Sequence, residues 1–340
     1  MRTSDFSYDL PSELIAQRPV RPRDRSRLLV LNRKSGDIEH SIFHQIGEYL
    51  NPHDVLVLNE TRVIPARIHA RKVPTGGAAE ILLLKRLGVQ TWEAMVGGKG
   101  LRPGQKLEIL RGPSVEIIED MGHSRRVVQF EAPISTQLDS IGEMPLPPYI
   151  HEPLEDPDEY QTIFAHSPGS SAAPTAGLHF TENLFEKLRV QGVEIAKIVL
   201  HVGLDTFAPV TEEDPHKHTI HTEWCSVTSE AADKINFASE EGGRIIAVGT
   251  TTVRTLETAA QSADTGYCVG SYEGSTDLFI IPGYHFRVVD AVITNFHLPR
   301  STLLMMISAF ADRSTILEVY QLAVQEQYRF YSFGDAMLIL

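Results

Sequence analysis

Apolar and polar positions follow different rhythms in successive parts of the chain. Short apolar runs bounded by turn residues at positions 28–31 and 54–58 predict buried strands. Between them, apolar side chains at helical spacing predict a helix, namely Ile42, Phe43, Ile46 and Leu50. The first sixty residues are therefore typical of an α/β domain.

The pattern changes after Pro65. From about residue 67 to 149 there is no helical period, and short strand-like runs are separated by Gly and Pro. These runs lie at 80–84, 91–96, 106–110, 115–119 and 126–130. Their regular spacing predicts a small β-barrel or sandwich, which ends in the proline-rich stretch at 144–150.

From residue 159 the α/β pattern returns. Helices are expected at 181–192, 228–241, 251–261, 301–311 and 315–328, and strands at 193–202, 244–248, 278–281 and 288–294. The predicted fold class is α/β, with a mixed sheet and flanking helices in a discontinuous main domain of residues 1–66 and 151–340. Residues 67–150 are expected to form an inserted small β-barrel domain.

Composition narrows the class of protein. A hydrophobic content of 42% and a charged content of 22% are typical of globular proteins and exclude fibrous and disordered classes. Acidic residues near the start exclude a secretory signal, and the uncharged run at 301–311 is too short to span a membrane. Cys225 and Cys268 lie far apart, as is typical of reduced thiols. We therefore expect a cytoplasmic protein without membrane attachment.

Positive charge is concentrated in two segments of an otherwise acidic chain. The formal net charge is −13, yet residues 62–111 contain ten Lys or Arg and only three acidic residues. Five arginines lie within residues 18–27, where Asp24 is the only acid. Such segments favour contact with phosphates, although solvated surface faces give the same pattern.

The stretch at 171–181 combines small residues with Pro174, Thr175, Gly177 and a single histidine, His179. Small residues allow the backbone to approach a ligand closely, and proline stiffens that approach. An apolar loop that carries an imidazole is typical of an active-site wall. A hydrogen-bonded core histidine in a tight buried loop is the alternative.

A second loop follows an expected strand, the position where open α/β sheets bind ligands. Gly249, Thr250 and Thr251 precede a helix whose free amides suit a carboxylate or phosphate, and Arg254 follows within that helix. The alternative is a threonine cap with a surface ion pair between Arg254 and Glu257.

Two more loops carry polar side chains. His297 follows the last expected strand, and residues 328–337 combine aromatic rings with Arg329 and Asp335. Aromatic rings beside arginine can stack a nucleobase, and core packing is the alternative.

Histidines gather with a carboxylate at His216, His218, His221 and Glu223, and His201 lies upstream. Such ligands suit zinc or iron, but the spacing is not that of a helical metal motif and no cysteine completes it. Acid–base work near neutral pH is the interpretation that we favour. The sequence has no dinucleotide, P-loop or nucleophile-elbow fingerprint.

Eight motifs in order carry a resemblance to a known family. They lie at 9–17, 23–28, 58–63, 145–150, 172–181, 248–251, 294–299 and 329–337. Together they resemble the S-adenosylmethionine:tRNA ribosyltransferase-isomerases of queuosine biosynthesis. The resemblance implies an α/β domain with an inserted β-barrel. It also implies that the ribosyl part of S-adenosylmethionine is transferred to 7-aminomethyl-7-deazaguanine at the tRNA wobble position and isomerised, giving epoxyqueuosine, adenine and methionine.

The resemblance places the site in these loops. We expect His179 beside the adenosyl group, with His221 and Glu223 exchanging protons. The expected substrate-binding residues are Asn59, Thr61, Arg62, Pro174, Thr175, Gly177, His201, Gly249, Thr250, Thr251, Arg254, Asn295, His297, Arg329 and Asp335. The expected tRNA contacts are Arg21, Arg23, Arg27, Arg67, Lys99 and Arg102.

The implied partners are S-adenosylmethionine, consumed as a substrate, and tRNA with a GUN anticodon. No permanently bound cofactor and no metal are expected, and the chain is expected to be a monomer. The sequence departs from the family pattern at Asp205, Ala208 and Ser275, and the basic run at 97–102 is thinned. The alternatives are a paralogue acting on an adenosyl or deazapurine compound without tRNA, a histidine-cluster metal hydrolase, and a non-catalytic RNA-binding module.

Overall fold

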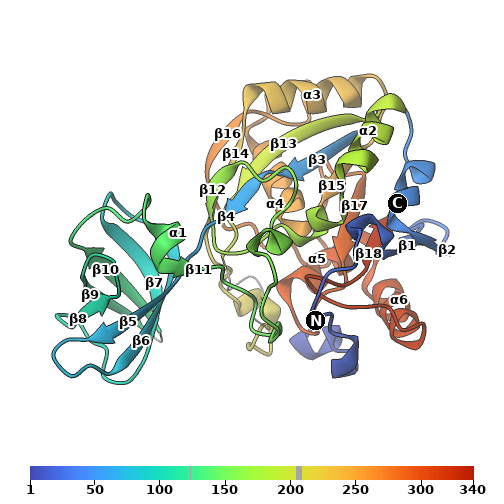
Figure 1. Ribbon diagram of the computed structural model, residues 1–340. Coiled ribbons are helices and arrows are strands. Elements are labelled where there is room, and N and C mark those ends of the chain that lie inside the picture. Colours follow the sequence, from blue (N-terminus) through green and yellow to red (C-terminus); the bar gives the residue numbers. More distant parts are fainter. Residues whose placement is uncertain (123, 204–208) are drawn as a thin grey trace. The chain divides into compact units, whose positions relative to one another are not determined.

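The computed structural model describes residues 1–122, 124–203 and 209–340, which form two compact units (Figure 1). The larger unit comprises Met1–Thr61, Pro148–Ser167 and Pro174–Leu340, and the smaller one comprises Arg62–Pro147 and Pro168–Ala173. The limits of the smaller unit differ from the expected 67–150. The reason is that the chain passes between the units through β4 (Thr61–Val63) and β12 (Ser167–Ser170), which form a two-stranded sheet.

A nine-stranded mixed sheet forms the centre of the larger unit. Its order is β16-β14-β13-β3-β15-β17-β18-β1-β2, and the four strands β13, β3, β15 and β17 run parallel. The strands are β1 (Arg27–Leu31), β2 (Ile38–Ile42), β3 (Val55–Asn59), β13 (Glu194–Leu200), β14 (Glu223–Val227), β15 (Ile245–Val248), β16 (Tyr272–Thr276), β17 (Ala291–Asn295) and β18 (Ala336–Ile339).

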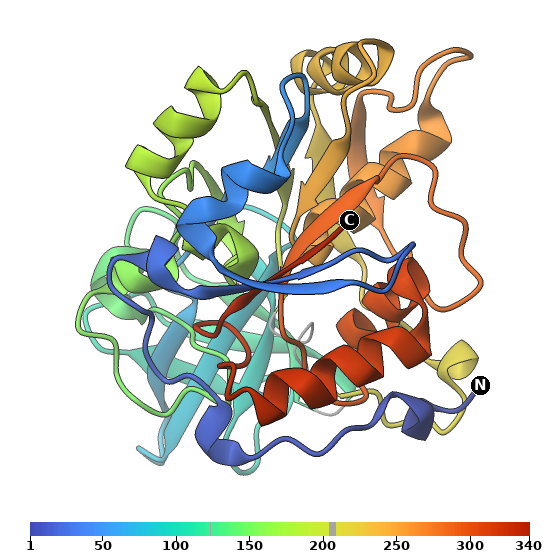
Figure 2. The same cartoon turned by 90° about the vertical axis from the view of Figure 1, so that its right-hand side faces the viewer.

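Helices cover both faces of this sheet (Figures 1 and 2). Alternate strand residues supply the two cores, so that Leu56 packs on one face and Val57 on the other. One face is covered by η4 (Phe43–Tyr49), η6 (Thr175–His179) and α2 (Glu182–Val190), and the other by α3 (Ser229–Glu240), α4 (Thr250–Ala259), α5 (Thr302–Ala311) and α6 (Arg313–Gln325). The expected α/β sheet with flanking helices is confirmed.

The remaining helices of the larger unit are short 3-10 turns. They are η1 (Thr3–Phe6), η2 (Ser12–Leu14), η3 (Arg23–Arg25), η5 (Pro157–Tyr160), η8 (Pro215–Lys217) and η9 (Ala260–Ser262). No helix among the described residues is long and apolar enough to cross a membrane.

Side-chain caps fix where three of the helices begin. Thr181, Thr228 and Ser301 each accept a hydrogen bond from the backbone N–H three residues further on. These caps define the ends of the preceding loops.

Six antiparallel strands close into a barrel in the smaller unit. Their order is β5-β6-β7-β10-β9-β8, and pairing of β8 with β5 completes the ring. The strands are β5 (Arg67–Lys72), β6 (Ala78–Arg86), β7 (Thr91–Gly97), β8 (Lys106–Ile109), β9 (Val115–Gly122) and β10 (Arg125–Phe130). The one-turn helix α1 (Leu138–Ile141) precedes β11 (Gly142–Glu143), which pairs with the start of β5. The expected inserted barrel is confirmed.

Two expected elements were wrong. The apolar run at 42–50 forms the 3-10 helix η4, in which the Leu50 N–H donates to the Gly47 carbonyl three residues back, and Gly47 lowers the α-helix propensity of the segment. Residues 278–281 are not a strand, since the Leu278 carbonyl accepts from Arg254 and the Leu278 N–H donates to Thr276. Side chains there replace the ladder partners of a strand. The strands that were not expected are β2, β4, β5, β11, β12, β14, β16 and β18.

Candidate active site at the edge of the sheet

The C-terminal ends of the parallel strands meet at one edge of the nine-stranded sheet. β13 and β15 lie on either side of β3, so the direction in which strands are added reverses there. Open α/β sheets bind their ligands at such a reversal. The structure thus brings together the expected loops that follow β3, β13, β15 and β17.

Asn59 links three of these strand ends. Its Nδ2 donates to the Leu200 carbonyl (3.0 Å) and to Oγ1 of Thr251 (3.4 Å), and its Oδ1 accepts from the N–H groups of Thr61 (3.1 Å) and Leu200 (3.0 Å). These four hydrogen bonds use the whole capacity of the amide. Asn59 therefore positions the loops of the edge.

His201 is oriented by two neighbours. Its Nδ1 lies 2.9 Å from Oγ1 of Thr61, and its ring stacks on Trp224 with centroids 5.1 Å apart. Burial lowers the pKa of His201. The ring is therefore held in a fixed orientation, and its neutral form is favoured.

His179 is buried, and both of its ring nitrogens have partners. Nδ1 lies 2.8 Å from Oγ of Ser26, and Nε2 lies 3.1 Å from Nδ2 of Asn295. The same Nδ2 donates to the Tyr331 carbonyl (3.1 Å), so Nε2 of His179 accepts and Nδ1 carries the proton. Burial lowers the pKa of His179 to about 3, with smaller contributions from nearby arginines. This geometry is that of a neutral, hydrogen-bonded core histidine that holds Asn295.

The loop that contains His179 approaches the sheet closely. Oγ1 of Thr175 donates to Oδ1 of Asn295 (3.2 Å), which ties η6 to the end of β17. At Gly177 a Cβ atom would lie 2.7 Å from the ring of Phe164 and 2.9 Å from the methyl group of Thr162, so a larger residue would displace both side chains. Pro174 precedes η6 as its first flanking residue.

Gly249 makes the turn from β15 into α4. Its φ of +91° is one that other residues rarely adopt, and its N–H donates to the Ile293 carbonyl (2.8 Å). Thr250 and Thr251 follow in the first turn of α4 and are buried.

His297 holds the loop after β17. Its Nε2 lies 2.7 Å from Oγ1 of Thr294, its N–H donates to the Tyr320 hydroxyl (2.9 Å), and its carbonyl accepts from the Tyr8 hydroxyl (2.5 Å). Burial lowers the pKa of His297 to about 3. These bonds support a positioning role for His297 within the loop.

Asp335 and Arg329 are joined through the backbone. The Asp335 carboxylate accepts from the N–H groups of Arg27 (3.0 Å) and Arg329 (2.8 Å), and burial raises its pKa. The Arg329 guanidinium donates to the carbonyls of Phe333 and Arg18. Both expected substrate ligands therefore make contacts within the chain.

Arg254 and Glu223 form a buried ion pair. The Arg254 Nε also donates to the Leu278 carbonyl (3.1 Å), and Oε1 of Glu223 accepts from the N–H of Gly203 (2.9 Å). Glu223, Arg254 and the exposed His221 line one pocket. The structure thus brings the two expected proton carriers, His221 and Glu223, to the same place.

Glu257 does not form the surface ion pair with Arg254 that was the alternative interpretation of this helix. Its buried carboxylate accepts from the Tyr284 hydroxyl (3.0 Å) and from the three consecutive N–H groups of residues 287–289. It therefore holds the loop before β17.

The side chains of the histidine cluster were considered above as possible metal ligands. No three His, Cys, Asp or Glu side chains within the part of the chain that the structure describes are placed to hold a metal ion. His218 instead lies 2.9 Å from a carboxylate oxygen of Glu212.

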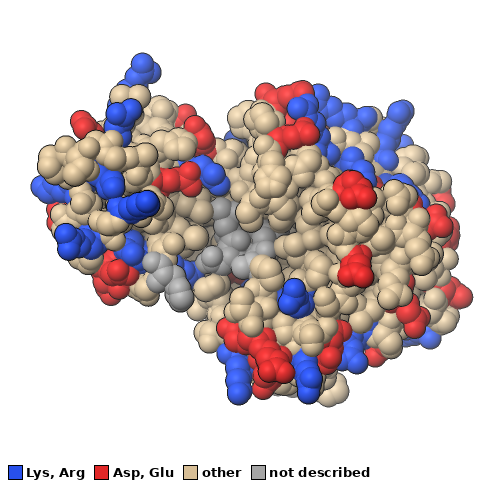
Figure 3. Space-filling view, turned by 90° about the horizontal axis from the view of Figure 1, so that it is seen from below, with Lys and Arg blue, Asp and Glu red and all other residues tan. Residues whose placement is uncertain are grey.

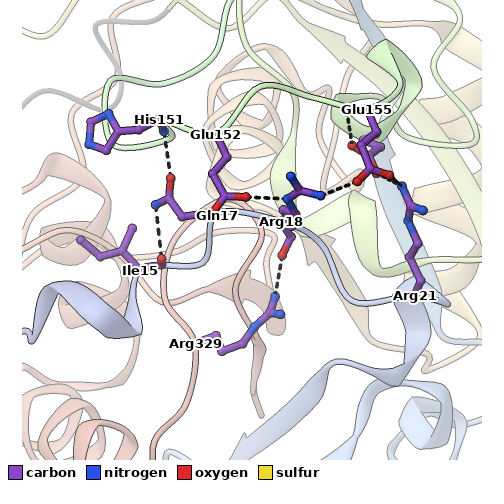
Figure 4. Close-up of polar contacts among 9 residues, drawn as sticks. Ile15, Gln17, Arg18, Arg21, His151, Glu152, Glu155 and Arg329 are labelled. Carbon is purple, nitrogen blue, oxygen red and sulfur yellow. Dashed lines mark hydrogen bonds and ion pairs between the residues drawn. The ribbon is translucent and has the colours of Figure 1, made fainter.

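Arginines of the 18–27 segment are partnered by acids of the same unit (Figure 4). Arg18 forms ion pairs with Glu152 and Glu155, and Arg21 forms them with Glu155 and Glu159. Four charged contacts thus attach the segment to residues 152–159, which follow the barrel in the chain.

Arg23 and Arg27 also have partners in the larger unit. Arg23 donates to the carbonyls of Gln161 (2.7 Å) and Asp158 (2.8 Å), and Arg27 lies 3.6 Å above the ring of Tyr328. Of the arginines expected to contact tRNA, those of this segment are therefore engaged within the chain.

The barrel carries cations of a different kind. Lys99 and Arg102 are exposed, and their side chains make no hydrogen bond or ion pair with any described residue. A guanidinium nitrogen of Arg67 lies 3.8 Å from a carboxylate oxygen of Glu80. Arg62 was expected in the substrate site, but it is exposed and belongs to the smaller unit. Figure 3 shows Lys and Arg side chains spread over the surface of this unit.

Sequence reasoning missed several residues of the edge. The residues that fix His179, His201 and Asn295 are Ser26, Phe43, Trp224 and Tyr331. Ser26 and Tyr331 belong to the motifs at 23–28 and 329–337, whereas Phe43 and Trp224 belong to none of the eight motifs. Of the departures from the family pattern, Asp205 and Ala208 lie outside the described residues. Ser275 is exposed on β16, and its carbonyl accepts from the Tyr272 hydroxyl (2.8 Å).

Comparisons with known proteins bear on the whole chain. Residues 3–339 match the family described as queuosine biosynthesis protein. Relatives named S-adenosylmethionine:tRNA ribosyltransferase-isomerase from Symbiobacterium thermophilum (55% identical over 344 residues) and Moorella thermoacetica (52% over 354) are matched over 100% of both chains.

A solved structure agrees with these relatives. The crystal structure of S-adenosylmethionine tRNA ribosyltransferase from Thermotoga maritima is 42% identical, with a TM-score of 0.58 over 99% of this chain and 100% of that chain. The resemblance seen in the eight motifs is confirmed. The chain therefore belongs to the queuosine biosynthesis protein family.

Proposed function

We propose that this protein is an S-adenosylmethionine:tRNA ribosyltransferase-isomerase of queuosine biosynthesis. It transfers the ribosyl moiety of S-adenosylmethionine to 7-aminomethyl-7-deazaguanine at the tRNA wobble position and isomerises it, and adenine and methionine leave. The observation that carries the proposal is the match to relatives of that name over the full length of both chains.

S-Adenosylmethionine is consumed as a substrate. It binds at the edge of the nine-stranded sheet where the parallel strands end. The helix that begins at Thr250 presents free N–H groups there, and Thr175 and Asn295 add hydrogen-bonding side chains on the other side of β15. His201, stacked on Trp224, closes the edge at β13.

Proton transfer is the second requirement. A base must remove a proton from the 5′ carbon next to the sulfonium, and an acid must help adenine to leave. His179 is buried, and both of its nitrogens are engaged, which supports a positioning role through Asn295 beside the adenosyl group. His221 is exposed at the pocket that Glu223 lines, and this supports proton exchange by that pair.

The tRNA, with a GUN anticodon, is held through its phosphates by exposed cations of the barrel. Lys99 and Arg102 lie in a loop where Gly98, Gly100 and Gly104 have positive φ, so the backbone turns sharply around them. The protein acts as a monomer in the cytoplasm, where tRNA is modified.

Adenine release from S-adenosylmethionine tests the proposal. It should require tRNA that carries 7-aminomethyl-7-deazaguanine, and the tRNA should then carry epoxyqueuosine. The matched control is the same tRNA with guanine at the wobble position, which should give no release. Release without any tRNA would favour the paralogue that acts on small molecules, and binding of tRNA without release would favour the RNA-binding module.

A further inference from the structure

One pocket of the larger unit combines apolar walls with a buried cation. The centre of a water-sized molecule can occupy about 50 Å³ of this pocket. The whole empty volume is about 560 Å³ when the open space at its mouth is included. The enclosed part suits a small terminal group rather than a purine ring. Apart from His218, His221, Glu223, Arg254 and Thr302, its lining is formed by Ile220, Leu278, Phe279, Ile280, Leu303 and Met306.

Not all hydrogen-bond donors of the Arg254 guanidinium have an acceptor among the described residues. A guanidinium carries five N–H groups. Those of Arg254 donate to the Leu278 carbonyl (3.1 Å), to Glu223 and to the Thr276 carbonyl (3.4 Å), and the side chain is 4% exposed. No described residue accepts from the other two N–H groups. Because a buried donor without an acceptor is costly, an acceptor within the pocket would stabilise this arrangement.

The pocket adjoins the edge at which the substrate is proposed to bind. Arg254 lies four residues, about 6 Å, along the axis of α4 from Thr250. Its partner Glu223 accepts from the N–H of Gly203, which follows β13 and His201. A substrate that is held at the start of α4 can therefore extend a short side arm into this pocket.

We infer that this pocket is the subsite for the amino-acid end of S-adenosylmethionine, with Arg254 binding its α-carboxylate. This inference rests on the proposed function. The carboxylate is the only anionic group of that substrate, and the planar fork of arginine matches it better than any other side chain does. The apolar walls suit the methylene groups of the arm.

The test compares S-adenosylmethionine with its decarboxylated analogue, which lacks only the carboxylate. Reactions contain tRNA with 7-aminomethyl-7-deazaguanine. The wild-type protein should prefer the carboxylated compound by about 10- to 100-fold in kcat/KM, the value of a hydrogen bond to a charged group. Arg254→Gln should reduce this preference to within about threefold, and Arg254→Lys should retain part of it.

A second variant leaves the buried ion pair intact, in case Arg254→Gln fails to fold. Ile220→Trp narrows the pocket and should raise KM for S-adenosylmethionine about tenfold, with KM for tRNA unchanged. The matched control is Val190→Trp on the exposed end of α2, which should alter neither.

An unchanged preference in Arg254→Gln, or an unchanged KM in Ile220→Trp, would overturn the subsite. The proposed function has a separate readout, because it fails when the wild-type protein forms no epoxyqueuosine from S-adenosylmethionine. Equal use of both compounds by the wild type would overturn the subsite and leave the proposed function standing.

Discussion

The two units hold their polar groups in opposite ways. At the sheet edge of the larger unit, Asn59 and His179 are buried, and their hydrogen bonds are made within the protein. On the barrel, Lys99 and Arg102 are exposed, and their side chains have no partner among the described residues. The smaller unit has twelve Lys or Arg against nine Asp or Glu, although the chain as a whole carries −13. Fixed groups are suited to chemistry, and free cations are suited to the capture of a polyanion.

The largest effect is expected at the edge of the larger unit. Asn295→Ala should lower kcat by about a hundredfold, because it removes the group that joins His179, Thr175 and the Tyr331 carbonyl. Affinity for tRNA should stay within about twofold, as measured by filter binding.

The control is Asn236→Ala, which removes a buried amide in α3 that bonds only to residues 268 and 269. It should lower stability and leave kcat unchanged at a temperature where the variant is folded. Equal kcat losses in the two variants would show that the edge has no special role.

Acid should weaken the larger unit. Burial lowers the pKa values of His179 and His297 to about 3, and in the unfolded chain they return to about 6.5. The unfolded state therefore binds more protons between pH 6.5 and 3, so the free energy of unfolding falls as pH falls through that window. The expected slope is about 1.4 kcal/mol per pH unit for each histidine.

Urea unfolding at a series of pH values measures that slope. His179→Gln should reduce it by about 1.4 kcal/mol per pH unit below pH 6.5. An identical slope in the variant would mean that His179 is protonated in the folded protein, contrary to its hydrogen bonding.

The barrel cations should act on binding alone. Lys99→Ala combined with Arg102→Ala should weaken tRNA binding about tenfold at low salt and make its salt dependence shallower by about one to two in logarithmic slope. At saturating tRNA, kcat should equal that of the wild type. A lowered kcat with unchanged tRNA affinity would mean that these cations take part in catalysis. The two units would then not differ in the way described above.

The smallest effect is expected from the partnered arginines. Arg18→Ala combined with Arg21→Ala should leave tRNA affinity and its salt dependence unchanged, because these side chains already pair with Glu152, Glu155 and Glu159. The Tm should fall by only about 1–2 °C, since both arginine side chains are exposed and ion pairs of exposed side chains contribute little. A change in salt dependence as large as that of the barrel variant would contradict the contrast.

The general fold was predictable where local signals are strong. The caps at Thr181 and Ser301 and the alternating strands of the barrel act within a few residues, so the sequence reveals them. The run at 278–281 has an apolar pattern, but the backbone carbonyl of Leu278 accepts a hydrogen bond from Arg254, more than twenty residues away in the sequence. Such a contact is invisible before the chain folds.

The same limit applies to the site. Loops after strands could be assigned to one edge, because parallel strands share their direction. The charge of the 18–27 segment could not be judged, since the acids that pair with it lie more than a hundred residues later, beyond the barrel. Likewise, Arg254 and Glu257 were adjacent on one helical face, and only the tertiary structure shows that each has a different partner.

The place of the barrel in the chain has a consequence for folding. β3 pairs with β13 and β15, and its first partner in β13 lies about 140 residues later. During synthesis β3 is complete long before either neighbour exists, whereas every strand of the barrel pairs within the barrel's own sequence. We expect the barrel to fold first and to shorten the loop that β3 and β13 must close, so that a self-contained module lowers the entropic cost of a distant pairing.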